Sequence, residues 1–138
     1  MKGIVARKWM KKPIFIIPQK AVITKGGKIL MVRRAPDSPI HPNLWDLPGG
    51  ILENKEKPEE GLKREVKEET NLKVKVVKPL FSCSESSNGN EVFFLLYECR
   101  ILSGKIKLSN EHTEWKWSGK REAAKMKKEP YLKLYLER

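Results

Sequence analysis

Three glutamates lie close together near the middle of the chain, within residues 63–70. On a helix with about 100 degrees between successive residues, Glu65, Glu68 and Glu69 share one stripe beside a separate apolar face. Like charges at this spacing destabilise a helix by roughly 0.2–0.5 kcal/mol per pair, unless a cation lies between them. Carboxylate oxygens suit hard divalent cations such as Mg²⁺ or Mn²⁺. The spacing therefore predicts a metal-binding stripe, although a solvated helix laced with ion pairs could show the same sequence.

A helix over residues 58–70 is the element that must position these glutamates. Pro58 suits a first helical turn, and the two glutamates after it complement the positive end of the helix dipole. Asn71 can adopt the left-handed conformation that ends a helix. Gly61 lies on the carboxylate stripe and costs about 1 kcal/mol in a helix interior. We therefore expect another part of the chain, or a ligand, to approach the helix closely at Gly61.

The segment 50–72 carries a longer pattern around this stripe, Gly-x5-Glu-x7-Arg-Glu-apolar-x-Glu-Glu-x-x-apolar. Eight residues meet it: Gly50, Glu56, Arg64, Glu65, Val66, Glu68, Glu69 and Leu72. The pattern, with its lead-in Trp-Asp-Leu-Pro-Gly-Gly at 45–50, resembles the Nudix box, and the chain is similar to MutT-like members of the Nudix hydrolase superfamily. One position departs from the family pattern, because Asn71 replaces the usual glycine. Asparagine is the next-best residue for a left-handed helix end, so the departure changes little.

The resemblance implies an α/β/α sandwich with a mixed β-sheet and a catalytic loop-helix-loop. It also implies a Mg²⁺-dependent (or Mn²⁺-dependent) pyrophosphohydrolase, in which water attacks phosphorus in a nucleoside diphosphate linked to another moiety. Metal ions held by clustered carboxylates neutralise the diphosphate and activate water. By position, the metal ligands are Glu65, Glu68, Glu69 and the Gly50 carbonyl, Glu56 supports the cluster, and Arg64 orients the glutamates.

The general base is less tightly specified, because family members draw it from the box or from a glutamate in a later loop. Here the later candidates are Glu111 and Glu114, and either could reach the metal ions. Each of them alone also fits an ordinary surface loop. His112 lies between them, and we expect it to be an ordinary loop histidine.

Substrate-binding candidates precede the box. Arg33 and Arg34 are expected to grip substrate phosphates, since arginine offers a two-pronged donor to phosphate oxygens, although solvent-facing charge at a strand end explains them as well. Trp45 could stack on a base, but a tryptophan beside a proline more often packs in the core.

Substrate choice is left open by the residues after the box. Neither the proline that marks ADP-ribose hydrolases nor the tyrosine that marks dinucleoside polyphosphate hydrolases occurs in the corresponding region, residues 87–90. This favours a nucleoside triphosphate, with an ADP-ribose or nucleotide-sugar pyrophosphatase as the alternative. The net charge of +12 attracts anions of every kind. A non-catalytic basic module that binds nucleotide or RNA is therefore a second alternative, and RNA is not the favoured partner.

The remaining elements are expected to form one mixed α/β domain. The 138 residues suffice for a single core, with residues 1–18 as a basic arm or edge strand and 19–138 as the hydrolase domain. The strands are expected at 21–24, 29–32, 74–84, 91–102 and 115–117, and further helices at 120–127 and 130–136.

The two cysteines are too few for a disulfide framework or a zinc site. If Asn88-Gly89 forms a hairpin turn, Cys83 faces Phe94 and Cys99 faces Lys78, so we expect two reduced thiols. No apolar run is long enough to span a bilayer, and no signal peptide is recognisable. A cytoplasmic location is therefore expected, and a homodimer is left open.

Overall fold

The computed structural model describes residues 14–87 and 89–138. The basic lead at residues 1–12 and Asn88 of the expected turn lie outside this part of the chain. In chain order the elements are β1 (Phe15–Ile16), β2 (Pro18–Lys25), β3 (Lys28–Arg34), β4 (Trp45–Asp46), β5 (Gly49–Ile51), α2 (Pro58–Thr70), β6 (Lys73–Ser87), β7 (Asn90–Ser103), β8 (His112–Ser118), α3 (Lys120–Lys125) and α4 (Pro130–Glu137).

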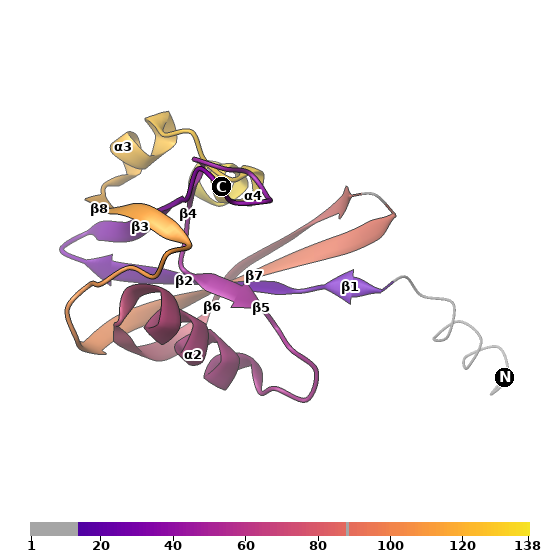
Figure 1. Cartoon of the computed structure of the whole chain (residues 1–138), viewed down its shortest axis with the longest axis horizontal. Coiled ribbons are helices and arrows are strands. Elements are labelled where there is room, and N and C mark those ends of the chain that lie inside the picture. Colours follow the sequence, from indigo (N-terminus) through magenta and orange to yellow (C-terminus); the bar gives the residue numbers. More distant parts are fainter. Residues whose placement is uncertain (1–13, 88) are drawn as a thin grey trace, which may run out of the picture.

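The described strands form one mixed sheet of eight strands. β2 lies at its centre, parallel to β7 and antiparallel to β3 and β5. β6 pairs with β7, while β4 and β8 pair with β3. Helix α2 covers one face of the sheet, and α3 and α4 cover the other (Figure 1). The expected α/β/α sandwich with a mixed sheet is confirmed.

Two hydrophobic cores lie on opposite faces of the sheet, as the alternation of side chains along a strand requires. Ala21 and Ile23 of β2 pack in the core that contains Leu62 of α2. Val22, between them, packs in the other core with Leu132 of α4. Because β2 is buried on both faces, its apolar run is nearly continuous rather than alternating.

Helix α2 has the predicted bounds. Asn71 ends it in the left-handed conformation, with φ of 65°, and its N–H donates to the Lys67 carbonyl. The close approach expected at Gly61 is confirmed, because a Cβ added there would lie 2.5 Å from Cδ of Glu56. No helix in the described part of the chain is long and apolar enough to cross a membrane.

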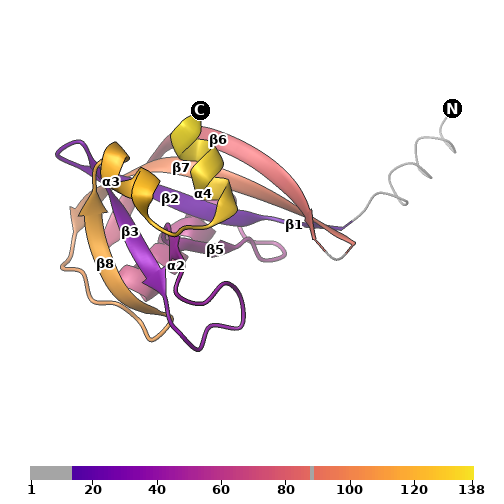
Figure 2. The same ribbon diagram turned by 90° about the horizontal axis from the view of Figure 1, so that it is seen from above.

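The β6–β7 hairpin extends well beyond the body of the molecule, with β1 beside its outer end (Figure 2). Cys83 faces Phe94, as predicted, and both cysteines are free. Cys99 faces Val76, so the prediction that it faces Lys78 is wrong. The pairing shifts between Val76 and Lys78 and again between Pro79 and Phe81, and these two irregularities move the register by two residues.

Candidate functional site

One large cavity, of about 1210 Å³, lies where α2, β5, the loop after β3, the loop before β8 and the start of α4 meet. Five of the residues predicted for the site line it: Arg34, Gly50, Glu65, Glu69 and Glu111. The lining combines carboxylates from α2 with arginine, histidine and aromatic side chains from other elements.

Glu69 is the most buried carboxylate of the cluster, with a relative exposure of 5%. Its Oε1 accepts a hydrogen bond from the Gly49 N–H at 3.2 Å. Burial raises the pKa of Glu69 to about 8, against the opposing effect of the Lys20 ammonium. Burial also raises the pKa of Glu65, and Arg64 opposes that shift. A cation in the cavity would stabilise both ionised carboxylates.

The pKa of Glu69 predicts how the metal-free protein responds to pH. The folded protein keeps the Glu69 proton up to about pH 8, whereas the unfolded chain loses it near the ordinary value of 4.5. Between these values the unfolded state binds fewer protons, so the free energy of unfolding falls as the pH rises from about 4.5 to 8. We expect Glu69→Gln to reduce this pH-dependent decrease in the free energy of unfolding by up to roughly 3–5 kcal/mol. Urea titrations at several pH values, with a chelator present, measure the decrease. Parallel pH profiles of the two proteins would contradict the assignment.

The Gly-Gly pair at 49–50 lets the backbone approach α2 closely. A Cβ on Gly50 would lie 2.5 Å from Cδ of Glu65. Gly49 has φ of 148°, and a Cβ there would lie 2.0 Å from the backbone oxygen of Gln19. The first contact is with a side chain that can move, and the second is with a strand that cannot.

Alanine substitutions at these two glycines should therefore have different effects. Gly50→Ala should displace the Glu65 carboxylate and weaken Mn²⁺ binding by about tenfold, with little loss of stability. Gly49→Ala should lower the free energy of unfolding by about 3 kcal/mol or more, because the backbone itself must shift. Isothermal titration with Mn²⁺ and urea denaturation separate the two results. Equal effects of the two substitutions on both quantities would contradict this difference.

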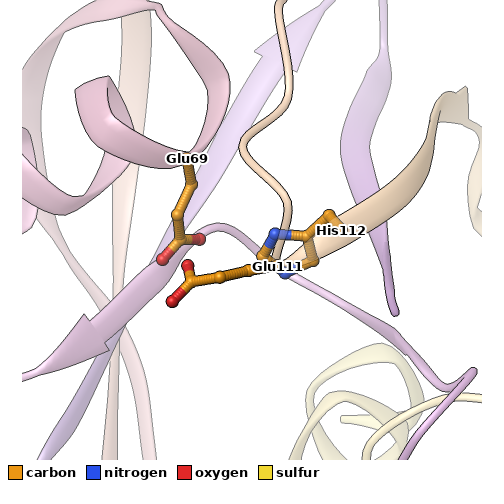
Figure 3. A group of neighbouring side chains, drawn as sticks. All are labelled: Glu69, Glu111 and His112. Carbon is orange, nitrogen blue, oxygen red and sulfur yellow. The ribbon is translucent and has the colours of Figure 1, made fainter. Parts of the chain in front are cut away.

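Glu111, at the end of the loop before β8, and His112, the first residue of β8, both line the cavity. This loop is attached to the C-terminal end of α2 by two backbone hydrogen bonds, from Lys107 N–H to the Thr70 carbonyl (3.0 Å) and from Ser109 N–H to the Glu69 carbonyl (3.1 Å). Candidate ligand atoms of three side chains lie within 4.8 Å of one another and point toward a common space (Figure 3): Glu69, Glu111 and His112.

His112 differs from an ordinary loop histidine in its surroundings. Its Nδ1 is buried and has no hydrogen-bond partner among the described residues. Burial lowers the pKa of His112 to about 4, so the imidazole is neutral at pH 7. Two carboxylates and a neutral imidazole are a donor set that fits a divalent cation.

Arg64 gathers the other box glutamates outside the cavity lining. Its Nε and a terminal nitrogen donate to one oxygen of Glu56, at 3.0 and 2.9 Å, and its second terminal nitrogen donates to Glu68 and contacts Glu65. The hydrogen bond from Arg64 holds the pKa of Glu56 below its usual value. The side chain of Glu68 is 57% exposed. Arg64 thus lies where the sequence predicted an orienting cation.

Three more predicted site residues, besides Glu56, Arg64 and Glu68, do not line the cavity. Arg33 donates to the Asn43 carbonyl at 3.0 Å and to Glu114 at 3.4 Å, in an exposed ion pair. Trp45 packs against the core beneath α3 and α4. The prediction that Glu114 lies in a loop is wrong, because it lies within β8, opposite Arg33 of β3. The geometry therefore favours Glu111 over Glu114 as the group that meets the carboxylate cluster.

A buried ion network at the inner end of the cavity was missed by sequence reasoning. Asp46 is fully buried and pairs with Lys20 at 3.0 Å and with Arg34 at 3.1 Å, and it accepts a hydrogen bond from Tyr131. Burial alone would raise the pKa of Asp46, but the two cations hold it below its usual value. The sequence signal that could have revealed this network is Asp46 itself, a charged residue between the apolar residues Trp45 and Leu47.

Glu129, just before α4, extends this network to the cavity rim. Its Oε1 accepts from Arg34 Nε at 2.9 Å, and its Oε2 lies 2.7 Å from Nδ1 of His41. Arg34 therefore bridges two buried carboxylates and is fixed in place beside the cavity.

Comparisons with known proteins agree with this geometry. The NUDIX domain model matches residues 20–137. A MutT-like protein of Streptomyces ambofaciens is 34% identical over 96 residues, 70% of this chain but only 58% of that protein. The ADP-ribose pyrophosphatase of Methanocaldococcus jannaschii is 31% identical over 119 residues, 82% of this chain and 69% of that protein. The crystal structure of a MutT protein from Methanosarcina mazei Go1 superposes with a TM-score of 0.81 at 29% identity, covering 92% of this chain and 93% of the other.

Proposed function

Because the chain belongs to the NUDIX domain family and is a Nudix hydrolase, we propose that it is a Mg²⁺-dependent pyrophosphohydrolase acting on nucleoside triphosphates. The single observation that carries the proposal is the cavity that Glu65, Glu69, Glu111 and Gly50 all line. This donor set suits a divalent cation, and the cavity is large enough for a nucleotide. The expected cytoplasmic location stays a prediction.

The cation would be held by the Glu65 and Glu69 carboxylates and the Gly50 carbonyl, and it would supply neutralisation of the polyphosphate charge. Glu68 belongs to the proposed ligand set by sequence, and joining it requires the side chain to leave Arg64. Mn²⁺ could replace Mg²⁺ at such a site. Arg64 and Glu56 act as positioning residues, since they fix the outer side of the cluster.

In the proposed reaction, the oxygen of a water molecule forms a bond to phosphorus while the anhydride P–O bond to the leaving pyrophosphate breaks. Glu111 accepts the proton of this water, because it faces the cluster from a loop anchored to α2. Arg34 lines the same cavity and donates to the phosphates. Roles for Arg33, Trp45 and Glu114 remain predictions that the cavity lining does not support.

Two alternatives differ in what the cavity binds. An ADP-ribose or nucleotide-sugar pyrophosphatase would use the same carboxylates, and the name of the M. jannaschii relative supports this alternative. A non-catalytic basic module would bind nucleotide or RNA by charge alone. The buried Glu69 argues against that module, because a carboxylate there repels phosphate unless a cation intervenes.

Product release from a panel of substrates tests the proposal. The panel contains nucleoside triphosphates, oxidised triphosphates, ADP-ribose, NADH and diadenosine polyphosphates, each with Mg²⁺, with Mn²⁺ and with a chelator. Metal-dependent release of pyrophosphate from triphosphates is the expected result. Turnover of ADP-ribose alone would select the first alternative. No turnover, with salt-dependent RNA binding, would select the second.

A further inference from the structure

His112 lies where a metal ligand would lie, although sequence reasoning treats it as an ordinary loop residue. We propose that a ring nitrogen of His112 completes the metal site formed with Glu69 and Glu111, so that the site favours cations such as Co²⁺ more strongly than a site of oxygen ligands alone. The proposal rests on the proposed function, which places Glu69 at the cation. It adds to that site a ring nitrogen of His112 and one carboxylate oxygen of Glu111, whose other oxygen remains to accept the proton of the attacking water.

The spacing of the three donors fits one ion. Cations of this class bind oxygen and nitrogen at about 2.0–2.2 Å, so their ligand atoms lie roughly 3 to 4.2 Å apart. The candidate atoms of Glu69, Glu111 and His112 all lie within 4.8 Å of one another. Small side-chain rotations would therefore bring them into a coordination shell.

The surroundings of the ring leave a lone pair for a ligand to use. Nδ1 of His112 is buried without a hydrogen-bond partner, although buried polar atoms are almost always satisfied. His41, the other histidine of the chain, differs in this respect, because its Nδ1 lies 2.7 Å from Glu129. A bound cation is the partner that the His112 ring lacks.

The backbone on both sides of the ring is fixed. His112 begins β8 in register with Arg34 of β3, and its N–H donates to the Ser109 carbonyl at 3.4 Å. The preceding Glu111 carbonyl accepts from Ala35 N–H at 3.0 Å. The imidazole is thus held at the cluster by the sheet and the loop, and a preorganised ligand loses little entropy on binding.

A nitrogen donor changes which cation the site prefers. Mg²⁺ favours oxygen ligands, whereas imidazole suits transition metals, whose affinity rises along the series from Mn²⁺ to Cu²⁺. Removing the nitrogen should therefore weaken Co²⁺ binding far more than Mg²⁺ binding. The ratio of the two dissociation constants is the measured signature.

The first experiment is calorimetric titration of the full chain with Co²⁺ and with Mg²⁺, separately. We expect His112→Gln to raise the Kd for Co²⁺ by about tenfold or more, while the Kd for Mg²⁺ changes by less than about threefold. The matched control is His41→Gln, which removes the other histidine and should leave the Co²⁺ to Mg²⁺ ratio unchanged. An unchanged ratio in folded His112→Gln would overturn the proposal.

A second readout needs no substitution at His112. On titration of the unaltered protein with Zn²⁺, the imidazole ¹⁵N signals of His112 should shift at the first equivalent, and those of His41 should not. Unshifted His112 signals under saturating Zn²⁺ would also overturn the proposal. Glu69→Gln distinguishes failure of the His112 ligand from failure of the metal site. If Glu69→Gln binds neither Co²⁺ nor Mg²⁺ while His112→Gln binds both as the unaltered protein does, only the nitrogen ligand is rejected. If the unaltered protein binds neither cation, the metal site itself is rejected.

Discussion

Glu69→Gln is expected to lower kcat for the best substrate of the panel by about 10³-fold or more. Glutamine keeps the shape of the side chain and can still accept the hydrogen bond from the Gly49 N–H. It removes the negative charge that Glu69 would carry with a cation bound, at the most buried position of the cluster. The measurement is initial-rate kinetics at saturating metal ion, with folding checked by circular dichroism. Turnover within about threefold of the unaltered enzyme would show that Glu69 does not serve the reaction.

The two candidates for the general base, Glu111 and Glu114, provide the comparison for this result. Glu111→Gln should lower kcat by about 10²–10⁴-fold if Glu111 accepts the proton of the attacking water. Glu114→Gln should change kcat by less than about threefold, since Glu114 pairs with Arg33 outside the cavity. A larger loss at Glu114 than at Glu111 would reverse the assignment of the general base.

Asp46→Asn is expected to lower the free energy of unfolding by about 3–5 kcal/mol. Asp46 is fully buried, and the asparagine would leave Lys20 without its ion-pair partner in a site that is almost inaccessible to water. Arg34 would be affected less, because it also pairs with Glu129. Urea denaturation followed by tryptophan fluorescence measures the change, with the slope of the transition checked against the unaltered protein.

Tyr131→Phe is the matched control for Asp46→Asn. It removes the hydroxyl that donates to Asp46 and accepts from the Leu47 N–H, but it keeps the ring stacked on Phe94. The expected loss is about 1–2 kcal/mol, the usual net contribution of two hydrogen bonds. A loss below about 1 kcal/mol in Asp46→Asn would mean that the Lys20–Asp46 ion pair contributes little net stability, as is known for buried pairs in other contexts.

Local sequence signals were sufficient for the helix that holds the site. Pro58 at the start and Asn71 at the end defined the bounds of α2, because both residues act through their own backbone conformations. Gly61 indicated a close approach, and the approaching group is Glu56. The spacing of Gly50, Glu65 and Glu69 likewise identified residues that line one cavity.

Long-range pairing was not available from the sequence. The network around Asp46 joins residues 26 and 85 positions apart along the chain, and only the folded sheet brings them together. The register of Cys99 was missed for a similar reason. A turn determines the pairing near it, but each irregularity shifts every later pair, and no sequence signal for the shift at Val76 was recognised.

The attachment of the Glu111 loop to α2 has a consequence for how this protein can change during evolution. The two hydrogen bonds that join the loop to α2 use the amide groups of Lys107 and Ser109, and their side chains play no part in them. Substitutions at these two positions, proline excepted, therefore leave the anchoring bonds available. The side chain of Lys107 can vary in charge and shape to meet new substrates while Glu111 keeps its place at the carboxylate cluster. Ser109 is more constrained, because its Oγ also accepts a hydrogen bond from the Glu111 N–H at 3.4 Å.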